Sequence, residues 1–359
     1  SDVCSSDLAF PLCAACEREY SDPEDRRFHA QAIGCPECGP RLEWWDAEGE
    51  TRATQDDALR MACDRIRDGG IVAVKGVGGF QLMVDATSAA AVRRLRERKA
   101  RPAKPVAVMF RDLDMAREHG GLTPDEEALL GSPEAPIVLV RGRSGRSGGA
   151  PLAAEVASGL PWIGAMLPSS PLHHLLLHDL GVPVVATSGN RSEEPICFRE
   201  AEVLERLGGV ADGFLVHDRP IVRPLDDSVM QWNAGRRQVL RRARGYVPLP
   251  VELPIGRGGG AVPEVVGLGT HQKNAVALGV EDRVWLSAHL GDMDTAAARE
   301  GFERTLEDLG SILGATPTVA VVDRHPDYYP TQQAIRSFGP ETSGGVLAVS
   351  HHAAPPGHR

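Results

Sequence analysis

Residues 71–80 read IVAVKGVGGF: an apolar run, a lysine and a turn rich in glycine. The run is short and β-branched, which is typical of a buried strand. It follows a helical pattern over residues 56–67 and the pair Gly69-Gly70. Glycines let the backbone approach a ligand, and Lys75 offers a charge to phosphate. The segment therefore predicts a helix, a turn and a strand that ends at a ligand. A plain glycine turn beside a solvated lysine is the alternative, because the Walker spacing is absent.

Short β-branched runs alternate with helical patterns on the C-terminal side of this segment. Such alternation is typical of a mixed α/β domain. A flexible loop is expected at residues 144–150, which read SGRSGGA. The predicted strands are 106–110, 137–140, 182–186 and 214–216, and the predicted helices are 89–99, 124–130, 171–180 and 199–207.

Residues 249–263 (LPVELPIGRGGGAVP) have the Pro and Gly density of a linker, so a domain boundary is expected there. Beyond it, strands are predicted first, then one long helix, then further strands. This order suits the opening of an actin-like ATPase fold. The predicted strands are 265–268, 274–278, 283–287, 319–323 and 346–349, and the helix is 295–313.

Two Cys-x2-Cys pairs, Cys13 with Cys16 and Cys35 with Cys38, are separated by 18 residues. Four thiolates at this spacing can close a tetrahedron around zinc. The segment around the cysteines is too small to form a hydrophobic core of its own, so its fold needs a cross-link such as a bound metal ion. We therefore predict structural zinc, without a catalytic role; a redox pair and free thiols are the alternatives. His29, between the pairs, is expected to be a surface or packing residue.

Length, net charge and hydropathy limit the classes of protein to which the chain can belong. At 359 residues, the chain is expected to form two or three units. Its formal charge of -10 argues against extensive contact with nucleic acid or an anionic membrane. No stretch approaches the ~18 apolar residues of a membrane helix, and the start lacks a secretion signal. We therefore expect a cytoplasmic protein that does not contact the membrane.

Cations and hydroxyls gather at several predicted strand and helix ends. Residues 96–105 (RERKARPAKP) hold five cations, which a solvated helix face would also explain, and residues 187–190 (TSGN) close a strand. Residues 219–229 (RPIVRPLDDSV) and 241–246 (RRARGY) fit either a ligand site or a structural ion-pair network. Their joint presence in an acidic chain predicts a site for a polyphosphate.

These motifs, taken in order, resemble the HypF family of carbamoyltransferases, which act in the maturation of nickel-iron hydrogenases. The run CAACEREYSDPEDRRFHAQAIGCPECGP resembles the second zinc motif of that family. VKGVGGFQLMVDAT, LRERKARPAKPVAVM, PSSPLHHLLL, ATSGN, RPLDDSV and RRARGYVP are similar to its YrdC-like domain, and GLGTHQKNAVAL, LSAHLGDMDT and DRHPDYYPT to the start of its carbamoyl-transfer domain. The resemblance covers nearly everything from residue 12 to residue 354.

The resemblance implies an α/β protein with a small zinc module, a YrdC-like mixed α/β domain and a truncated actin-like ATPase (ASKHA) type domain. The front of the family, an acylphosphatase domain and a first zinc motif, and much of its back are expected to be absent. The implied divisions are a non-native or disordered tail at 1–12, the zinc module at 13–45, the YrdC-like domain at 54–250, a linker at 251–263, a partial carbamoyl-transfer domain at 264–354 and a tail at 355–359.

The tail at 355–359 is expected to arise from a frameshift. The family carries a His-His-x-Ala-His metal signature, and this chain reads His351-His352-Ala353-Ala354 followed by PPGHR. One inserted cytidine converts codons for His-Leu-Ala-Thr and onward into codons for Pro-Pro-Gly-His-Arg. We therefore expect the final histidine to be lost and the carbamoyl transfer to be incomplete, with adenylation retained. Resequencing the source DNA tests this, because an in-frame Pro355 without an extra base contradicts it.

The family's chemistry implies roles for the motif residues. Carbamate, released from carbamoyl phosphate, would be adenylated by ATP with Mg2+, and the carbamoyl group would pass to the C-terminal cysteine of the partner HypE for the cyanide ligands of the hydrogenase. Lys75, Arg101 and Lys104 are expected on the phosphates and carbamate. The expected nucleotide-site residues are Thr187, Ser188, Asn190, Arg223, Asp226 and Arg244 in the YrdC-like domain and His271, Lys273 and Asn274 in the next, where His289 and Asp292 are further candidates.

The implied metals are structural zinc on the four cysteines and a further ion in the complete carbamoyl-transfer domain, with His351 among its ligands. The rival reading within the same chemistry is a threonylcarbamoyl-adenylate synthase of tRNA modification, against which the zinc motif and the third domain argue. A zinc protein that binds nucleic acid is the rival from another class. The acidic total and an aromatic content of 5% argue against it, because bases stack on aromatic side chains.

Overall fold

The computed structural model describes residues 10–30, 34–142, 150–191, 194–253, 263–339 and 345–351. Most of the expected tail at 1–12, the tail at 355–359, and most of the loop at 144–150 and of the linker at 251–263 lie outside these ranges. The chain divides into two compact units. The first comprises Ser1–Gly131, Ile137–Arg191 and Ile196–Leu225, and the second comprises Ser132–Pro136, Ser192–Pro195 and Asp226–Arg359.

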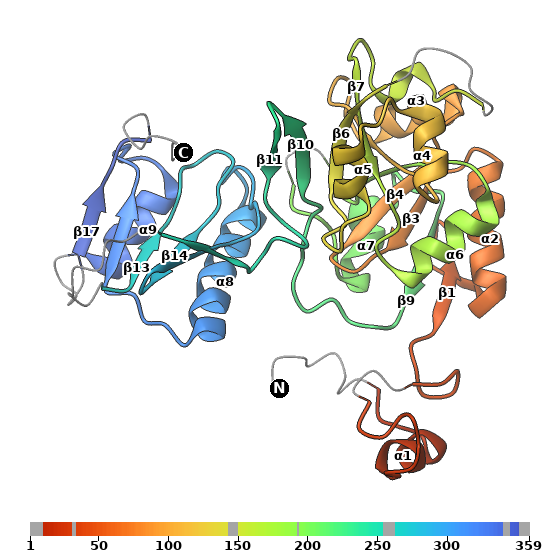
Figure 1. Ribbon diagram of the computed structural model, residues 1–359, viewed down its shortest axis with the longest axis horizontal. Coiled ribbons are helices and arrows are strands. Elements are labelled where there is room, and N and C mark those ends of the chain that lie inside the picture. Colours follow the sequence, from red (N-terminus) through yellow and green to blue (C-terminus); the bar gives the residue numbers. More distant parts are fainter. Residues whose placement is uncertain are drawn as a thin grey trace. The chain divides into compact units, whose positions relative to one another are not determined.

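The first unit is built on a mixed sheet flanked by helices (Figure 1). Its nine strands follow one another in the order β6-β7-β5-β8-β4-β3-β9-β1-β2. The strands are β1 (Leu42–Trp45), β2 (Thr51–Thr54), β3 (Val72–Lys75), β4 (Phe80–Asp85), β5 (Ala107–Met109), β6 (Ile137–Arg141), β7 (Trp162–Met166), β8 (Val184–Ser188) and β9 (Gly213–His217). The helices are α1 (Ala14–Ser21), α2 (Gln55–Arg67), α3 (Ala89–Arg98), α4 (Leu113–His119), α5 (Pro124–Leu130), α6 (Pro171–Leu180) and α7 (Glu200–Leu207), with a 3-10 turn at Ala154–Val156.

The helices of this unit begin and end where local chemistry requires. α5 starts with a capping box between Thr123 and Glu126, with Pro124 as its first residue. α6 starts at Ser170, which accepts a hydrogen bond from the third helical N–H, and ends at Gly181 in the left-handed region. α2 and α6 lie side by side although they are distant in sequence (Figure 1). Both helices thereby cover apolar faces that their sequences present.

Strands β1 and β2 lie outside the set predicted from sequence. Both are short: β1 (LEWW) buries Trp44, whereas β2 (TRAT) exposes most of its side chains. β1 pairs antiparallel with β9, from Leu42 opposite His217 to Trp45 opposite Phe214. The last residues of the expected zinc module, 42–45, therefore form a strand of the main sheet. Next to β1, Arg41 donates its N–H to the Asp218 carboxylate at 2.8 Å.

The second unit holds an antiparallel hairpin, β10 with β11, and a six-stranded sheet of order β12-β15-β14-β13-β16-β17. β12 pairs with β15, so residues 250–252 belong to this sheet, where we had placed the end of a domain and the start of a linker. The elements are β10 (Val229–Asn233), β11 (Arg236–Arg241), β12 (Pro250–Glu252), β13 (Val265–Gly267), β14 (Ala277–Val280), β15 (Arg283–Leu286), α8 (Ala296–Leu313), β16 (Val319–Val322), α9 (Tyr329–Phe338) and β17 (Gly345–Ala348).

The core of the six-stranded sheet is filled from α8. Phe302 is fully buried and Leu309 nearly so, and both pack with Val266, Leu278 and Ala320 of the strands. α8 is capped by Thr295 and ends at a left-handed glycine. Within the part of the chain that the structure describes, every helix is too short or too polar to cross a lipid bilayer.

Candidate functional site

Three strands of the first sheet end at the same edge. β3 and β9 are parallel, and β3 and β8 each pair antiparallel with β4, so β3, β8 and β9 run in one direction. Lys75 ends β3, Ser188 ends β8 and His217 ends β9. Ser188 lies opposite Gln81 at the start of β4, and Lys75 lies opposite Phe80. Ligands of α/β sheets bind at the carboxyl ends of strands, so this edge is the candidate site.

The turn after β8 is tied to α3 by Lys99. The Lys99 ammonium donates to the backbone oxygen of Ser188, to that of Asn190 at 2.8 Å, and to Asn190 Oδ1 at 2.7 Å. Ser188 Oγ donates to the same Oδ1 at 2.7 Å. Because Lys99 is only 2% exposed, its charge acts in a medium of reduced dielectric constant. The turn therefore combines a hydroxyl, an amide and a buried cation, which together favour an anionic ligand.

Lys99 was missed by sequence reasoning, although it lies within the basic run. α3 buries Val92, Leu95 and Arg96. Lys99 follows Leu95 by four residues, and residues four apart share one face of a helix. The helical phase is therefore the signal that could have placed Lys99 inward; treating the five cations as one solvated group concealed it.

The remaining cations of the basic run mostly bind the protein's own backbone. Arg96 is 7% exposed and donates to the carbonyl oxygens of Arg101 at 2.9 Å and Lys104 at 3.0 Å. Arg101 in turn donates from Nη2 to the carbonyl of Pro105 at 2.7 Å. Lys104 is exposed. Arg96 thus shapes the loop that carries the two predicted substrate ligands, Arg101 and Lys104.

Lys75 is fully buried, and its three N–H donors meet three acceptors of the protein. Its ammonium forms an ion pair with Glu200 and donates to the carbonyls of His217 at 2.8 Å and Arg219 at 2.6 Å. Burial, and then the charge of Lys75, lower the pKa of His217 to about 4, so this imidazole is neutral at pH 7. We predicted that Lys75 contacts phosphate, but these donors are directed at protein groups.

Thr187 and Arg223 also belong to the first unit. Thr187 lies in β8 opposite Leu82 and is 7% exposed. Arg223 is exposed and lies in the segment that follows β9. The end of that segment is fixed, because Leu225 donates its N–H to the carbonyl of Gly78 at 2.8 Å.

Asp226 and Arg244 lie in the second unit. Arg244 donates from Nε and Nη2 to one carboxylate oxygen of Asp227, at 3.1 and 2.8 Å, and to the carbonyl of Ala135 at 2.8 Å. Asp226 pairs with Arg241 at 2.8 Å. These contacts correspond to the structural ion-pair network that we considered as an alternative for both motifs.

The predicted nucleotide loop of the second unit surrounds Asn274. This side chain is 1% exposed, and its Nδ2 donates to the carbonyls of Leu268 at 2.9 Å and Thr270 at 2.5 Å. Among the described residues, Asn274 Oδ1 is buried without a hydrogen-bond partner. Lys273, in the left-handed region at a φ of 49°, donates its N–H to the Asp292 carboxylate at 2.7 Å. The loop is therefore held from both sides by its own polar groups.

Histidines of the second unit pair with carboxylates. His271 Nε2 lies 3.0 Å from the Asp294 carboxylate, and His351 Nδ1 lies 2.6 Å from that of Asp323. Asp323 is 6% exposed and also accepts the N–H of His351 at 3.0 Å. A carboxylate in this position orients an imidazole that binds metal through its other nitrogen. Burial, and then the charge of Arg241, lower the pKa of His289.

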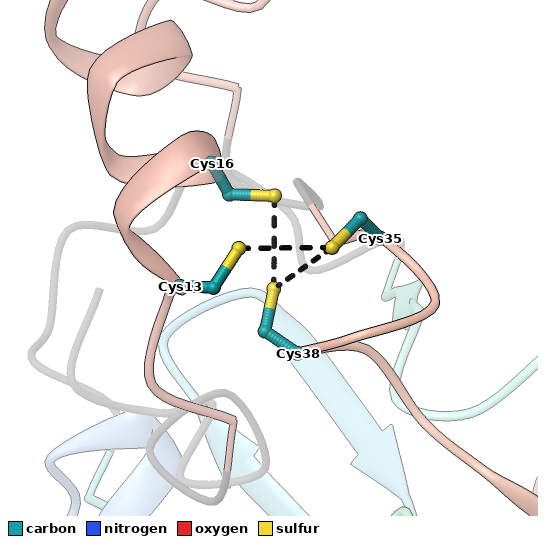
Figure 2. Close-up of side chains that lie close together, drawn as sticks. All are labelled: Cys13, Cys16, Cys35 and Cys38. Atoms are coloured by element: carbon teal, nitrogen blue, oxygen red, sulfur yellow. Dashed lines mark hydrogen bonds between the residues drawn. The ribbon is translucent and has the colours of Figure 1, made fainter.

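Four cysteines converge, two from the start of helix α1 and two from the turn at residues 35–38 (Figure 2). Sulfur–sulfur distances are 3.7 Å from Cys13 to Cys35, 3.8 Å from Cys35 to Cys38 and 3.6 Å from Cys16 to Cys38. A zinc–sulfur bond of about 2.3 Å gives a tetrahedron whose edges are about 3.8 Å, so the thiols fit zinc. All four are free of disulfides. Backbone hydrogen bonds lower the pKa of Cys38, whereas burial raises the pKa of Cys16, so within the cluster Cys38 is the thiol that ionises more readily. In the described ranges, this is the only cluster of three or more metal-ligating side chains.

Family matches cover most of the chain. Residues 12–45 match the HypF finger, residues 64–243 match the Sua5, YciO and YrdC family described as Telomere recombination, and residues 260–355 match the HypF Kae1-like domain. The middle match spans about half of the chain.

Individual proteins are similar along nearly the whole chain. The carbamoyltransferase HypF of Synechocystis sp. is 44% identical over 95% of this chain and 49% of its own length. A crystal structure of full-length HypF in the phosphate- and nucleotide-bound form has a TM-score of 0.86 and 38% identity, over 97% of this chain and 44% of its own. A threonylcarbamoyl-AMP synthase of Bacillus subtilis is more distant, with 25% identity over 59% of this chain and 61% of its own. The chain spans about half the length of the curated HypF relatives it matches.

The sheet and the match over residues 64–243 define a YrdC-like domain. With a HypF finger before it and a Kae1-like domain after it, the chain belongs to the HypF family of carbamoyltransferases. The predicted fold class, a mixed α/β chain with these three parts, is confirmed.

Proposed function

We propose that this chain activates carbamate with ATP at the carboxyl edge of its first sheet. The supporting observation is Lys99, a buried cation bound to the Ser188–Asn190 turn, in a domain that matches the YrdC family. A carbamate oxygen attacks the α-phosphorus of ATP, the bond to the bridging oxygen breaks, and pyrophosphate leaves. The product, carbamoyl adenylate, carries AMP as a good leaving group.

This step needs positioning and charge neutralisation more than a nucleophilic side chain. Lys99 would fix the turn that presents Ser188 and Asn190, with Thr187 beside them on β8. Arg101 and Lys104 would meet the phosphates and carbamate from the loop that Arg96 shapes, and Arg223 would approach the polyphosphate. Mg2+ would accompany the polyphosphate.

A second step would use the Kae1-like domain. There the carbamoyl group would pass to the C-terminal cysteine of HypE, where the thiolate displaces AMP and forms a thiocarboxamide. His271, Lys273 and Asn274 would contribute to the nucleotide loop of that domain, and the Asp323–His351 pair would contribute to its metal site. Asp226, just before β10, and Arg244, just after β11, would hold the two ends of the hairpin together. The proposal retains the cytoplasmic location expected from sequence.

Zinc, once bound to the four cysteines, would supply structure alone, because all four tetrahedral positions are taken by protein. The thiols of Cys13, Cys16, Cys35 and Cys38 would hold it. No step of the proposed reaction passes through this ion.

Exchange of labelled pyrophosphate into ATP tests the first step. In the presence of Mg2+, carbamate is expected to support this pyrophosphate exchange. It is supplied by an ammonium bicarbonate solution, with which it is in equilibrium. Threonine with bicarbonate, the substrate pair of the rival synthase, is expected to leave the rate at background. Exchange that requires threonine would reverse the assignment, and absence of exchange with either would refute adenylation by this chain.

A further inference from the structure

The segment between β9 and the second unit, residues 218–225 (DRPIVRPL), will be called the strap. It contains the pair Arg219-Pro220 and the pair Arg223-Pro224. Proline fixes its own φ and restricts the preceding residue to extended conformations. Both arginines are exposed. The strap is therefore a stiff segment that presents two cations.

The entry of the strap is held at two points. Asp218 accepts the N–H of Arg41 on its carboxylate at 2.8 Å and donates its own N–H to the Arg41 carbonyl at 3.2 Å. Lys75 donates to the carbonyls of His217 and Arg219, on either side of Asp218. Because Lys75 is fully buried, these hydrogen bonds are shielded from competing water.

The far end of the strap is held by Gly78. Its carbonyl accepts the N–H of Leu225 at 2.8 Å. A Cβ added to Gly78 would lie 2.1 Å from the carbonyl oxygen of Leu225, a backbone atom that cannot move alone. Close contact between the two backbones thus requires glycine at this position. The glycine turn seen in the sequence therefore receives the strap.

The strap is fixed at both ends and exposed between them: its entry is held by Lys75, the last residue of β3, and by Arg41, and its far end is held by Gly78 in the turn that follows β3. We propose that Lys75 is a positioning residue for nucleotide binding: its ammonium holds the entry of the strap so that Arg223 meets the polyphosphate at the carboxyl edge of the sheet. This inference rests on the proposed function. It gives Lys75 an indirect role, through the strap, in place of direct contact with phosphate.

Prior fixation of a ligand-binding segment improves affinity because less conformational entropy is lost on binding. Loss of the Lys75 anchor should therefore weaken nucleotide binding only as far as the strap contributes to it. Direct contact with phosphate would instead contribute independently of Arg223. The two roles of Lys75 can be told apart by combining substitutions. If Lys75 acts through Arg223, the losses of nucleotide affinity from the two substitutions do not add; if it contacts phosphate itself, they do.

Calorimetric titration with α,β-methylene-ATP and Mg2+ tests this in wild type, Lys75→Met, Arg223→Ala and the double variant. Each single substitution is expected to weaken binding about tenfold. The double variant should bind within about twofold of Arg223→Ala. Multiplied effects, about a hundredfold in the double variant, would overturn the proposal, as would wild-type affinity in Lys75→Met.

Hydrogen exchange of the peptide covering the strap supplies a second readout. Exchange should be faster in Lys75→Met and in Gly78→Ala, and unchanged in Arg60→Met, which removes an exposed ion pair of α2. An unchanged rate in Lys75→Met would contradict the anchoring role. If Lys75→Met does not fold, the double variant Gly78→Ala/Arg223→Ala takes its place. Its affinity for the analogue must then lie within about twofold of that of Arg223→Ala alone.

The outcomes separate this inference from the proposed function. If the wild-type protein binds the analogue but does not catalyse exchange, adenylation is refuted. The calorimetric and hydrogen-exchange comparisons of the variants then still test the role of Lys75. A wild-type protein that does not bind the analogue would overturn both.

Discussion

Lys99 and Asn190, 91 residues apart, are joined by two hydrogen bonds from one buried ammonium, to the carbonyl oxygen and to Oδ1 of Asn190. The contact fixes the phase of α3 relative to the end of β8. The end of helix α3 and the turn after β8 are thereby joined into one rigid element.

Lys99→Met should remove this connection without changing the volume much. Two carbonyls and an amide oxygen would lose a donor in a buried place, so we expect unfolding to be easier by about 2–3 kcal/mol and nucleotide affinity to fall at least tenfold. Denaturant titration and calorimetry measure both. Lys104→Met, at an exposed site, should change the unfolding free energy by less than about 0.5 kcal/mol. Equal stabilities of the two variants would contradict the role given to Lys99.

The cysteine cluster should contain one zinc ion per chain. Elemental analysis of the purified protein is expected to show this stoichiometry, and Cys35→Ser should lose the ion because three thiolates hold it less tightly. Cys63→Ala is the matched control, since Cys63 is buried in α2 and should keep the metal in place. Retention of zinc by Cys35→Ser would show that the ion binds elsewhere.

His217 should make stability depend on pH. Its folded pKa of about 4 lies below the usual value near 6.5, so the unfolded chain binds the proton more readily. The contribution is therefore complete above pH 6.5 and is lost as the pH falls toward 4, by about 3 kcal/mol. Urea unfolding at pH 7 and pH 4.5 should show a larger loss for wild type than for His217→Gln. Other groups titrate alike in both proteins, so parallel losses would refute the assignment.

Arg244 should be needed as arginine and not only as a cation. Its guanidinium binds the Asp227 carboxylate and backbone carbonyls at the same time, which an ammonium cannot reproduce. Arg244→Lys is expected to cost about 2–4 kcal/mol, because it leaves a buried carboxylate poorly paired. Arg236→Lys, at an exposed position of β11, should be neutral. Equal melting curves for the two variants would contradict this prediction.

The sequence predicted elements well where local chemistry defines their ends. The predicted ranges 124–130 and 171–180 coincide with α5 and α6, because proline, a capping residue and a final glycine mark each of them. Among the strands that it missed, β2 and β11 are mostly exposed, whereas β4 and β7 are mostly buried. β2 and β11 are the outer strands of local hairpins and bury few side chains, so they show no apolar alternation. β4 and β7 pair with strands distant in the chain, β4 with β8 and β7 with β5, which periodicity within one segment does not report.

In the candidate site, too, features set by local sequence could be predicted, and features set by distant residues could not. The spacing of the four cysteines was sufficient to predict their cluster, because one helix start and one short turn each bring two sulfurs to the same place. The partner of Lys75 could not be predicted, since Glu200 is 125 residues away and belongs to a helix with an ordinary surface pattern. Lys99 could have been predicted from helical phase, which was applied to the apolar residues of α3 and not to its cations.

Only Gly39 and Pro40 separate Cys38 from Arg41, and Arg41 is hydrogen-bonded to Asp218, the first residue of the strap. Because the link is so short, the four cysteines can move little relative to the start of the strap. If the strap meets nucleotide as proposed, the module would anchor it from a distance, and removing a bound zinc ion with a chelator should then weaken nucleotide binding without any contact between the ion and the nucleotide.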